Sequence, residues 1–189
     1  MTTIYFVRHS ESDSNIKDDR SRPLTARGNS NCVLATNFLK DKQIDVVLSS
    51  PYKRAVDTLT DFAQVSGLTI QTVEDFREIE NPWIEDWIPK VKKQWQDFSY
   101  KIQGEESLAE TQKRNITALN ETLRFYKDKN IAIGTHGVAL STIINFYDNS
   151  YGFDDFMDMV HLTPWIAKIE FSGFNCIKIE KINLFELAK

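Results

Sequence analysis

Three short, mostly apolar runs constrain the fold of this chain more than any other feature of its sequence. They cover residues 4–7, 45–48 and 131–135. Runs that are apolar at successive positions, and not at alternate ones, are typical of short strands buried on both faces of a sheet. Segments with helical periodicity separate these runs along the chain. This alternation predicts an α/β fold, a three-layer α/β/α sandwich around a largely parallel sheet.

The segments between and after the runs carry the signals of helices. We expect helices over residues 25–40, 51–66, 106–129 and 137–147. Pro51 suits the first turn of the second helix, where its missing N–H costs nothing, and Gly67 is suited to end that helix. Apolar stripes on the first and third helices are expected to face the core, and they consist of Val33, Leu34, Phe38 and Leu39 and of Leu108, Ile116, Leu119, Leu123 and Phe125.

The remaining segments complete the expected sheet and leave one region apart. Residues 69–73 alternate as a strand, and residues 166–171 and 176–182 flank a turn, which predicts a hairpin late in the chain. Residues 79–104 fit this scheme least well, because they hold three of the four tryptophans together with two prolines. We expect this segment to form a cap over one end of a single domain that spans residues 1–189.

Composition excludes several classes of protein. The chain holds 12 Phe, 4 Trp and 6 Tyr, far more aromatic surface than a disordered chain carries. Its net charge of −4 argues against a sequence-independent nucleic-acid binder, which would show the opposite balance. No apolar run approaches the ~18 residues of a membrane span, and the first residues lack the pattern of a signal peptide. The two cysteines, Cys32 and Cys176, are expected to be free thiols in a cytoplasmic protein.

Side chains that suit phosphate chemistry follow the three apolar runs. Arg8 and His9 come directly after the first run, Arg54 follows the second, and His136 and Gly137 follow the third. Because the carboxyl ends of parallel strands meet at one edge of a sheet, we expect these residues to lie close together. Arginine offers paired donors to phosphate oxygens, a helix start adds backbone N–H groups, and a neutral imidazole can attack phosphorus. The sequence therefore predicts a pocket for a tetrahedral oxyanion.

Taken in order, these residues resemble the histidine phosphatase superfamily, the phosphoglycerate-mutase-like enzymes. The resemblance covers roughly residues 3–171 and rests on Arg8-His9, Leu24-Thr25 with Gly28, Ser49-Ser50 with Arg54, Glu78, and His136-Gly137. An Arg-His pair alone would carry no weight, whereas the ordered and correctly spaced set is specific. The resemblance implies the same α/β/α fold and phosphoryl transfer through a histidine.

The resemblance also implies roles for the matched residues. His9, Glu78 and His136 are the expected catalytic residues: His9 accepts the phosphoryl group as a phosphohistidine, and Glu78 donates a proton to the leaving oxygen. The oxygens of the phosphate are expected to be held by Arg8, Asn15, Arg54 and His136, together with the backbone at Gly137. No metal or other cofactor is implied, because arginines and histidines neutralise the charge of the phosphate.

Three positions depart from the pattern of the superfamily. Ser10 stands where the first motif has glycine; serine fits if φ is negative, and its hydroxyl is then a candidate donor to phosphate. Asp57 stands where glutamine is common, and its carboxylate is expected to be solvated. Trp165 is a candidate for shaping the substrate pocket.

Other conspicuous side chains have plainer explanations. Trp83, Trp87 and Trp95 have helical spacing. We expect them to pack the cap against the body of the protein; the alternative is that they line a pocket for an apolar part of the substrate. Lys90, Lys92 and Lys93 are expected to form a solvated face; the alternative is that they attract an acidic substrate. His161 matches no motif and is expected to be structural. Metal-ligand spacing is absent from the histidines and cysteines of the sequence, so no zinc site is expected.

We predict a phosphatase that hydrolyses a small phosphorylated metabolite. A mutase would use the same pocket but return the phosphoryl group to another hydroxyl. The stretch from Asn15 to Thr25 shows no counterpart of the first-motif extension of the longer mutases, which favours hydrolysis. A non-catalytic, regulatory phosphate-binding protein is the third reading, and Ser10 is the feature that allows it. The sequence leaves the identity of the substrate and the oligomeric state open.

Overall fold

A six-stranded sheet in the order β3-β2-β4-β1-β5-β6 forms the centre of the molecule. The computed structural model describes residues 1–187. The strands are β1 (Thr2–Arg8), β2 (Val46–Ser49), β3 (Ile70–Thr72), β4 (Asn130–Thr135), β5 (Trp165–Ser172) and β6 (Asn175–Ile182). Strands β1 to β4 are parallel, while β5 and β6 extend the sheet as an antiparallel hairpin. The predicted parallel sheet and late hairpin are therefore confirmed.

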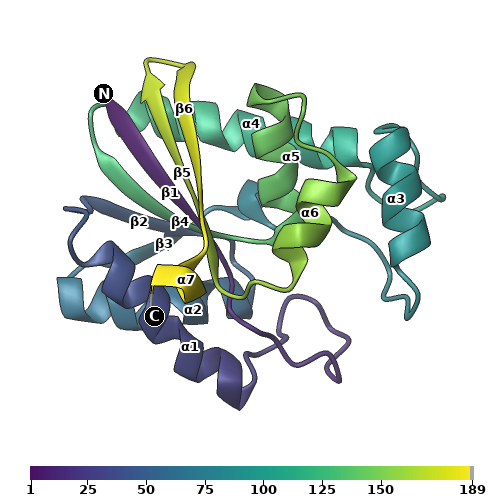
Figure 1. The fold of residues 1–189 in the computed structure, drawn as a ribbon, viewed down its shortest axis with the longest axis horizontal. Coiled ribbons are helices and arrows are strands. Elements are labelled where there is room, and N and C mark those ends of the chain that lie inside the picture. Colours follow the sequence, from purple (N-terminus) through teal and green to yellow (C-terminus); the bar gives the residue numbers. More distant parts are fainter. Residues whose placement is uncertain (188–189) are drawn as a thin grey trace.

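Helices cover both faces of this sheet (Figure 1). They are α1 (Ala26–Leu39), α2 (Lys53–Ser66), the 3-10 turn η1 (Glu74–Phe76), α3 (Ile88–Gln96), α4 (Leu108–Phe125), α5 (Gly137–Tyr147), α6 (Phe153–Val160) and α7 (Leu184–Leu187). On one face α1 contacts α2 and α7, and on the other α5 contacts α4 and α6. These layers confirm the α/β/α sandwich. Among residues 1–187 no helix is long and apolar enough to cross a membrane.

The central strand β1 is held by a core on each side. Tyr5 and Val7 belong to the cluster beneath α1 and α2, whereas Ile4 and Phe6 belong to the larger cluster beneath α4 and α5. Fully burying an aliphatic or aromatic side chain contributes about 1.5–3 kcal/mol. This two-sided burial explains the unbroken apolar run in the sequence. It also fixes the end of β1, from which Arg8 and His9 leave.

Two of the expected apolar stripes differ from the sequence prediction at one position each. Phe125 is 77% exposed, because it lies two residues after the buried Leu123 and thus on nearly the opposite side of α4. Val33 is 49% exposed, because the buried side of α1 is formed by a different row of residues, most of which are small. That row is Gly28, Cys32, Ala35 and Leu39. The expected C-terminal cap of α2 is confirmed, because Gly67 has a left-handed φ of 66°.

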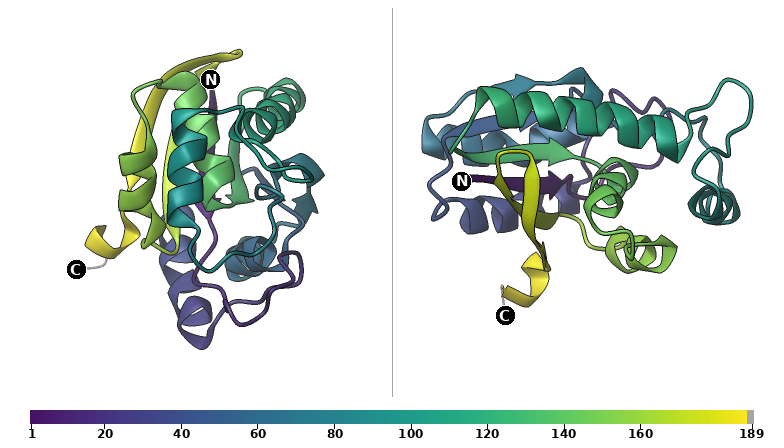
Figure 2. Two further views of the ribbon diagram at one scale, coloured as in Figure 1. Left: turned by 90° about the vertical axis from the view of Figure 1, so that its right-hand side faces the viewer. Right: turned by 90° about the horizontal axis from the view of Figure 1, so that it is seen from above.

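The regions least determined by the sequence gather at one end of the molecule. Helix α6 was not predicted, and α3 lies inside the segment 79–104 that was set apart as a cap. Figure 2 shows α3 beyond the end of α4, on the side toward which the arrows of β1 and β4 point. The aromatic ring of Trp95 from α3 lies 6.3 Å from that of Phe156 in α6. Helices α3 and α6 therefore lie near the strand ends that carry Arg8, His9 and His136.

Candidate active site

The ring of His9 is held in a single orientation at the end of β1. Its Nδ1 atom lies 2.6 Å from the carbonyl oxygen of Ser10, and its Nε2 atom lies 3.1 Å from Nε of Arg54. A carbonyl oxygen can only accept and a guanidinium nitrogen can only donate. Nδ1 therefore carries the proton, and Nε2 presents its unshared electron pair. This is the tautomer that a nucleophilic imidazole needs.

The surroundings of His9 keep its ring neutral. Burial lowers the pKa of His9 well below its ordinary value, and the positive charges of Arg54 and Arg8 lower it further. The pKa of His136 is lowered for the same reasons, first by burial and then by Arg54. Both rings are thus neutral at pH 7, so the Nε2 atom of His9 can attack phosphorus once Arg54 releases it.

Arg8 is anchored by the carboxyl end of α6. Its Nη1 atom donates to the carbonyl oxygens of Met159, Val160 and Leu162 at 2.8, 2.9 and 3.1 Å. The Nε atom is buried and has no hydrogen-bond partner within residues 1–187. Burial lowers the pKa of Arg8 to about 10, which leaves the guanidinium charged at pH 7. One end of the group is fixed, while the other retains an unused donor next to His9.

His136 lies deeper than the other expected site residues. Its ring centre is 5.3 Å from that of His9, and its Nε2 atom is 2.7 Å from the hydroxyl of Ser50. The Nδ1 atom of this fully buried ring has no partner in the described part of the chain. The predicted pairing of two histidines from separate strand ends is therefore present.

Glu78 binds the start of α5 instead of pointing freely into solvent. Its carboxylate accepts from the backbone N–H groups of Ile79 at 3.1 Å, Val138 at 3.1 Å and Ala139 at 2.8 Å. Burial is the dominant influence and raises the pKa of Glu78, although these N–H groups and Arg54 oppose it. The sequence assigned the N–H groups of this helix start to phosphate, but two of them serve Glu78. Gly137 still lies beside the site.

A cavity of about 460 Å³ opens in front of these groups. At its inner end it is lined by Arg8, His9, Arg54, Glu78 and Gly137. It extends outward between the loop after β1, whose lining side chains are polar or charged, and the segment that contains α3, whose lining side chains are mostly apolar. The site thus combines a basic inner end with an extension that has one polar and one mostly apolar wall.

Comparison with known proteins identifies the family. Residues 4–176 match the model of the histidine phosphatase superfamily (branch 1). The chain belongs to this superfamily. Its curated relatives include a protein of Bacillus subtilis (strain 168) that bears the name uncharacterized phosphatase PhoE. The two are 28% identical over 149 residues, which cover 76% of each chain. Phosphoserine phosphatase 1 of Hydrogenobacter thermophilus is 25% identical over 154 residues. The match covers 74% of this chain and 73% of that enzyme's chain.

Solved structures show the same histidine phosphatase fold. A phosphoserine phosphatase from Entamoeba histolytica aligns with a TM-score of 0.77 over 97% of both chains, at 20% identity. YhfR of Bacillus stearothermophilus aligns with a TM-score of 0.74 over 94% of this chain and 95% of its own, at 22% identity. The resemblance inferred from the ordered motifs is therefore confirmed for both family and fold.

Two of the expected site residues, Asn15 and His136, are not among those that line the cavity. Asn15 is exposed, and its amide nitrogen donates to Asp13 at 2.9 Å within the same loop. Arg22, which the sequence analysis missed, lines the cavity instead. Its guanidinium lies 3.0 Å from the carboxylate of Asp19, which in turn lies 3.2 Å from Arg54. In the sequence, the only signal for Arg22 was its position directly before Pro23. In the structure, the loop that contains both residues folds back on the segment that follows β1, where Leu24 forms an isolated β-bridge with Ser12.

A second missed residue shapes the histidine phosphatase site from behind. Arg114 of α4 donates to the backbone carbonyl oxygens of Asp75, Arg77 and Glu78 at 2.8–3.0 Å. It also forms a buried ion pair with Glu106 at 2.6 Å. A single side chain thereby fixes the loop that presents Glu78. Its long-range contacts have no signature in the local sequence.

The departures from the superfamily pattern prove to be structural. Trp165 is buried in the core under α5 and does not line the cavity, which corrects the role expected for it. Asp57 pairs with Lys53 at 2.7 Å on the surface of α2. Lys92 and Lys93 are exposed as expected, whereas Lys90 is largely buried against Glu105. Each of these side chains is thus explained by its immediate neighbours.

Ser10 does not bind phosphate through its hydroxyl in this arrangement. The hydroxyl donates to the carbonyl oxygen of Gly28 at 2.7 Å, and the backbone N–H donates to Thr58 at 2.9 Å. Ser10 is fully buried and is not among the residues of positive φ. Its hydrogen bond ties the end of β1 to α1, at a point where the backbones of Gly28 and Glu11 approach closely.

Ser10→Gly is therefore expected to destabilise the protein by about 1–2 kcal/mol, because it removes a buried hydrogen bond and adds freedom to the unfolded chain. Turnover should change little. Urea unfolding monitored by circular dichroism measures the effect, and Ser10→Ala separates the loss of the hydroxyl from the backbone contribution. A more stable or markedly more active glycine variant would show that the superfamily glycine is preferred here after all.

Proposed function

We propose that this protein hydrolyses a small phosphomonoester through a phosphohistidine at Nε2 of His9. The observation that carries the proposal is the tautomer of His9, which is neutral, is fixed by Ser10 and keeps its Nε2 atom unprotonated, where Arg54 now donates to it at the inner end of the cavity. Curated relatives that bear phosphatase names support the same reaction class. Solved neighbours in complex with phosphoserine and with 3-phosphoglycerate support a small phosphorylated metabolite as the substrate.

In the first step, the Nε2 atom of His9 forms a bond to phosphorus as the bond from phosphorus to the ester oxygen breaks. Glu78, whose pKa burial raises, gives its proton to the leaving oxygen. In the second step, water attacks the phosphohistidine and the nitrogen–phosphorus bond breaks. Glu78 takes a proton from this water, and inorganic phosphate and the neutral ring of His9 remain.

The arginines and His136 stabilise the negative charge of the phosphoryl group during transfer. Arg8 contributes its unpartnered Nε atom, and Arg54 exchanges its contact with His9 for one with a phosphate oxygen. His136 contributes its unpartnered Nδ1 atom. Arg22 is a better candidate than Asn15 for a further phosphate contact, because it lines the cavity. Preorganised charges of this kind supply much of the rate enhancement of such enzymes.

We further propose that residues 1–189 act as one domain, with the segment 79–104 as its cap. The cavity supports this arrangement, because the cap lines its outer part and the strand ends line its inner part. A cytoplasmic location is in keeping with Cys32 and Cys176, which are both free thiols.

We expect hydrolysis to be independent of metal ions, because the basic side chains already supply the charge that stabilises the transition state. Release of inorganic phosphate from a panel of phosphorylated metabolites should be unchanged in excess EDTA and inhibited by vanadate. Activity that EDTA abolishes and magnesium restores would contradict this prediction.

The purified protein can also be used to distinguish hydrolysis from mutase activity and from phosphate binding without catalysis. With 3-phosphoglycerate, phosphorus NMR distinguishes inorganic phosphate, the product of hydrolysis, from 2-phosphoglycerate, the product of a mutase. A protein that binds phosphate in calorimetry but turns over no ester in the panel would be a phosphate-binding protein, and the proposed function would be wrong.

A further inference from the structure

Gln94 is a buried amide without a partner on the wall of the cavity. Its side chain is 0% exposed, and it belongs to the residues that line the cavity on the α3 side. Neither its Oε1 nor its Nε2 atom has a hydrogen-bond partner in residues 1–187. Buried polar groups are nearly always paired, because desolvation without a partner costs free energy. An amide left unpaired beside a cavity is therefore available to a ligand.

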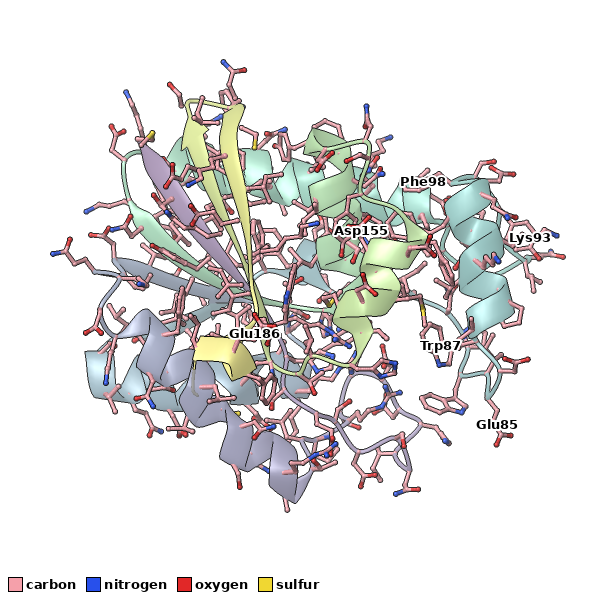
Figure 3. The ribbon with its side chains drawn as sticks, viewed as in Figure 1. Glu85, Trp87, Lys93, Phe98, Asp155 and Glu186 are labelled. Atoms are coloured by element: carbon pink, nitrogen blue, oxygen red, sulfur yellow. The ribbon has the colours of Figure 1, made fainter. Side chains whose placement is uncertain are left out.

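The cavity wall around Gln94 is apolar and largely aromatic. Trp87 and Val91 lie on the same side of α3, and Phe156 and Val160 face them from α6. The rings of Trp87 and Phe156 meet edge to face, with centroids 6.1 Å apart. Figure 3 shows Trp87 in the space between α3 and α6, while Lys93 points away from it. A ligand that reaches Gln94 must therefore pass between apolar surfaces.

The one α3 lysine that lines the cavity beside Gln94 is already paired with a carboxylate. Lys90 lies one turn before Gln94 and also lines the cavity. Its ammonium group is 2.6 Å from the carboxylate of Glu105, and the two side chains are only 10% and 7% exposed. An anionic ligand group at this point would meet Glu105 as well as Lys90. At this point of the cavity an uncharged group is therefore favoured, while Lys17 and Arg22 add positive charge elsewhere in the lining.

We propose that Gln94 binds the far end of the substrate, the end opposite the phosphate. The substrate is then a phosphomonoester whose alcohol has an apolar body of roughly aromatic size. That body ends in an uncharged group that both donates and accepts hydrogen bonds, such as a primary amide or a hydroxyl. Small esters with a carboxylate beside the phosphate would leave Gln94 unpaired. This inference rests on the proposed phosphomonoesterase function.

Three benzyl phosphates test the inference, because the methylene group insulates the leaving oxygen from the ring substituent. They carry a carbamoyl, a methyl or a carboxylate group at the para position. We expect kcat/KM to be about tenfold higher for the carbamoyl ester than for the methyl ester, and lower still for the carboxylate ester. In Gln94→Leu, the preference for the carbamoyl ester over the methyl ester should vanish.

A matched variant and a stability measurement distinguish ligand binding from packing. Gln96→Leu makes the same change at an exposed position of α3 and should keep the preference for the carbamoyl ester. Gln94→Leu should melt about 3 °C higher than the parent, because an unpaired buried amide is replaced by an apolar group. An amide that mattered only for the fold would instead lower the melting temperature when removed.

Two results would overturn the inference while leaving the proposed function intact. The first is equal hydrolysis of the carbamoyl and methyl esters by the parent protein. The second is a Gln94→Leu variant that melts lower and loses activity equally on all three esters. If none of the esters nor p-nitrophenyl phosphate is hydrolysed, the proposed function itself fails and the inference falls with it.

Discussion

His9→Ala is expected to lower the turnover of any phosphomonoester by about 10⁴-fold or more, because the atom that forms the bond to phosphorus is lost. Rapid quenching of the parent protein with a labelled substrate should trap a phosphoenzyme that is labile in acid and stable in base. The variant should trap none. Within residues 1–187 the side chain of His9 makes two hydrogen bonds, so the fold is expected to survive the substitution.

His161→Ala is the matched control for this experiment. His161 is exposed at the end of α6, and it is the one histidine of the chain outside the predicted site. The His161→Ala variant should form the phosphoenzyme and turn over substrate as the parent protein does. A label that persists in His9→Ala would assign the covalent step to another residue, and His136 would be the first to examine.

Glu78→Gln is expected to have an effect that depends on the leaving group. Expulsion of an alkoxide needs a proton, whereas p-nitrophenolate leaves without one. The substitution should therefore slow an alkyl phosphate by about 10²-fold or more and slow p-nitrophenyl phosphate far less. The pH profile provides a second readout. Activity on the alkyl ester should fall as pH rises through the pKa of Glu78, which burial shifts upward.

Glu85→Gln serves as the control, because Glu85 is exposed in the cap and points away from the body of the protein (Figure 3). It should behave like the parent protein on both esters. Equal losses on the two esters in Glu78→Gln, measured on the phosphorylation step, would contradict a role as proton donor. Glu78 would then act only by organising the start of α5.

The inner end of the site was predictable because parallel strands impose its geometry. Arg8, His9, Arg54 and His136 each follow a buried strand, and the topology alone brings such residues to one edge of the sheet. The strands themselves were recognisable because burial on both faces leaves continuous apolar runs. These features are local in sequence, so a single chain reveals them.

The outer part of the site was less predictable because it depends on contacts between distant segments. Helix α6 is short, yet carbonyl oxygens at its end accept hydrogen bonds from Arg8. Val160, for example, lies 152 residues after Arg8 in the sequence. Arg22 reaches the cavity only because its loop folds back on Ser12. The expected position of Asn15 failed for the same reason, since the path of that loop decides which side chains face inward. Loop paths of this kind leave no periodic pattern in a sequence.

The anchoring of Arg8 also bears on when the protein becomes active during its synthesis. Arg8 is made among the first residues, but the carbonyl oxygens that orient it belong to Met159, Val160 and Leu162. Its backbone partner in the sheet, Trp165, is made later still. A nascent chain on the ribosome therefore has His9 long before it has a fixed guanidinium beside it. The proposed phosphate site forms only when the two ends of the chain meet, so a truncated translation product would carry Arg8 and His9 without a formed site.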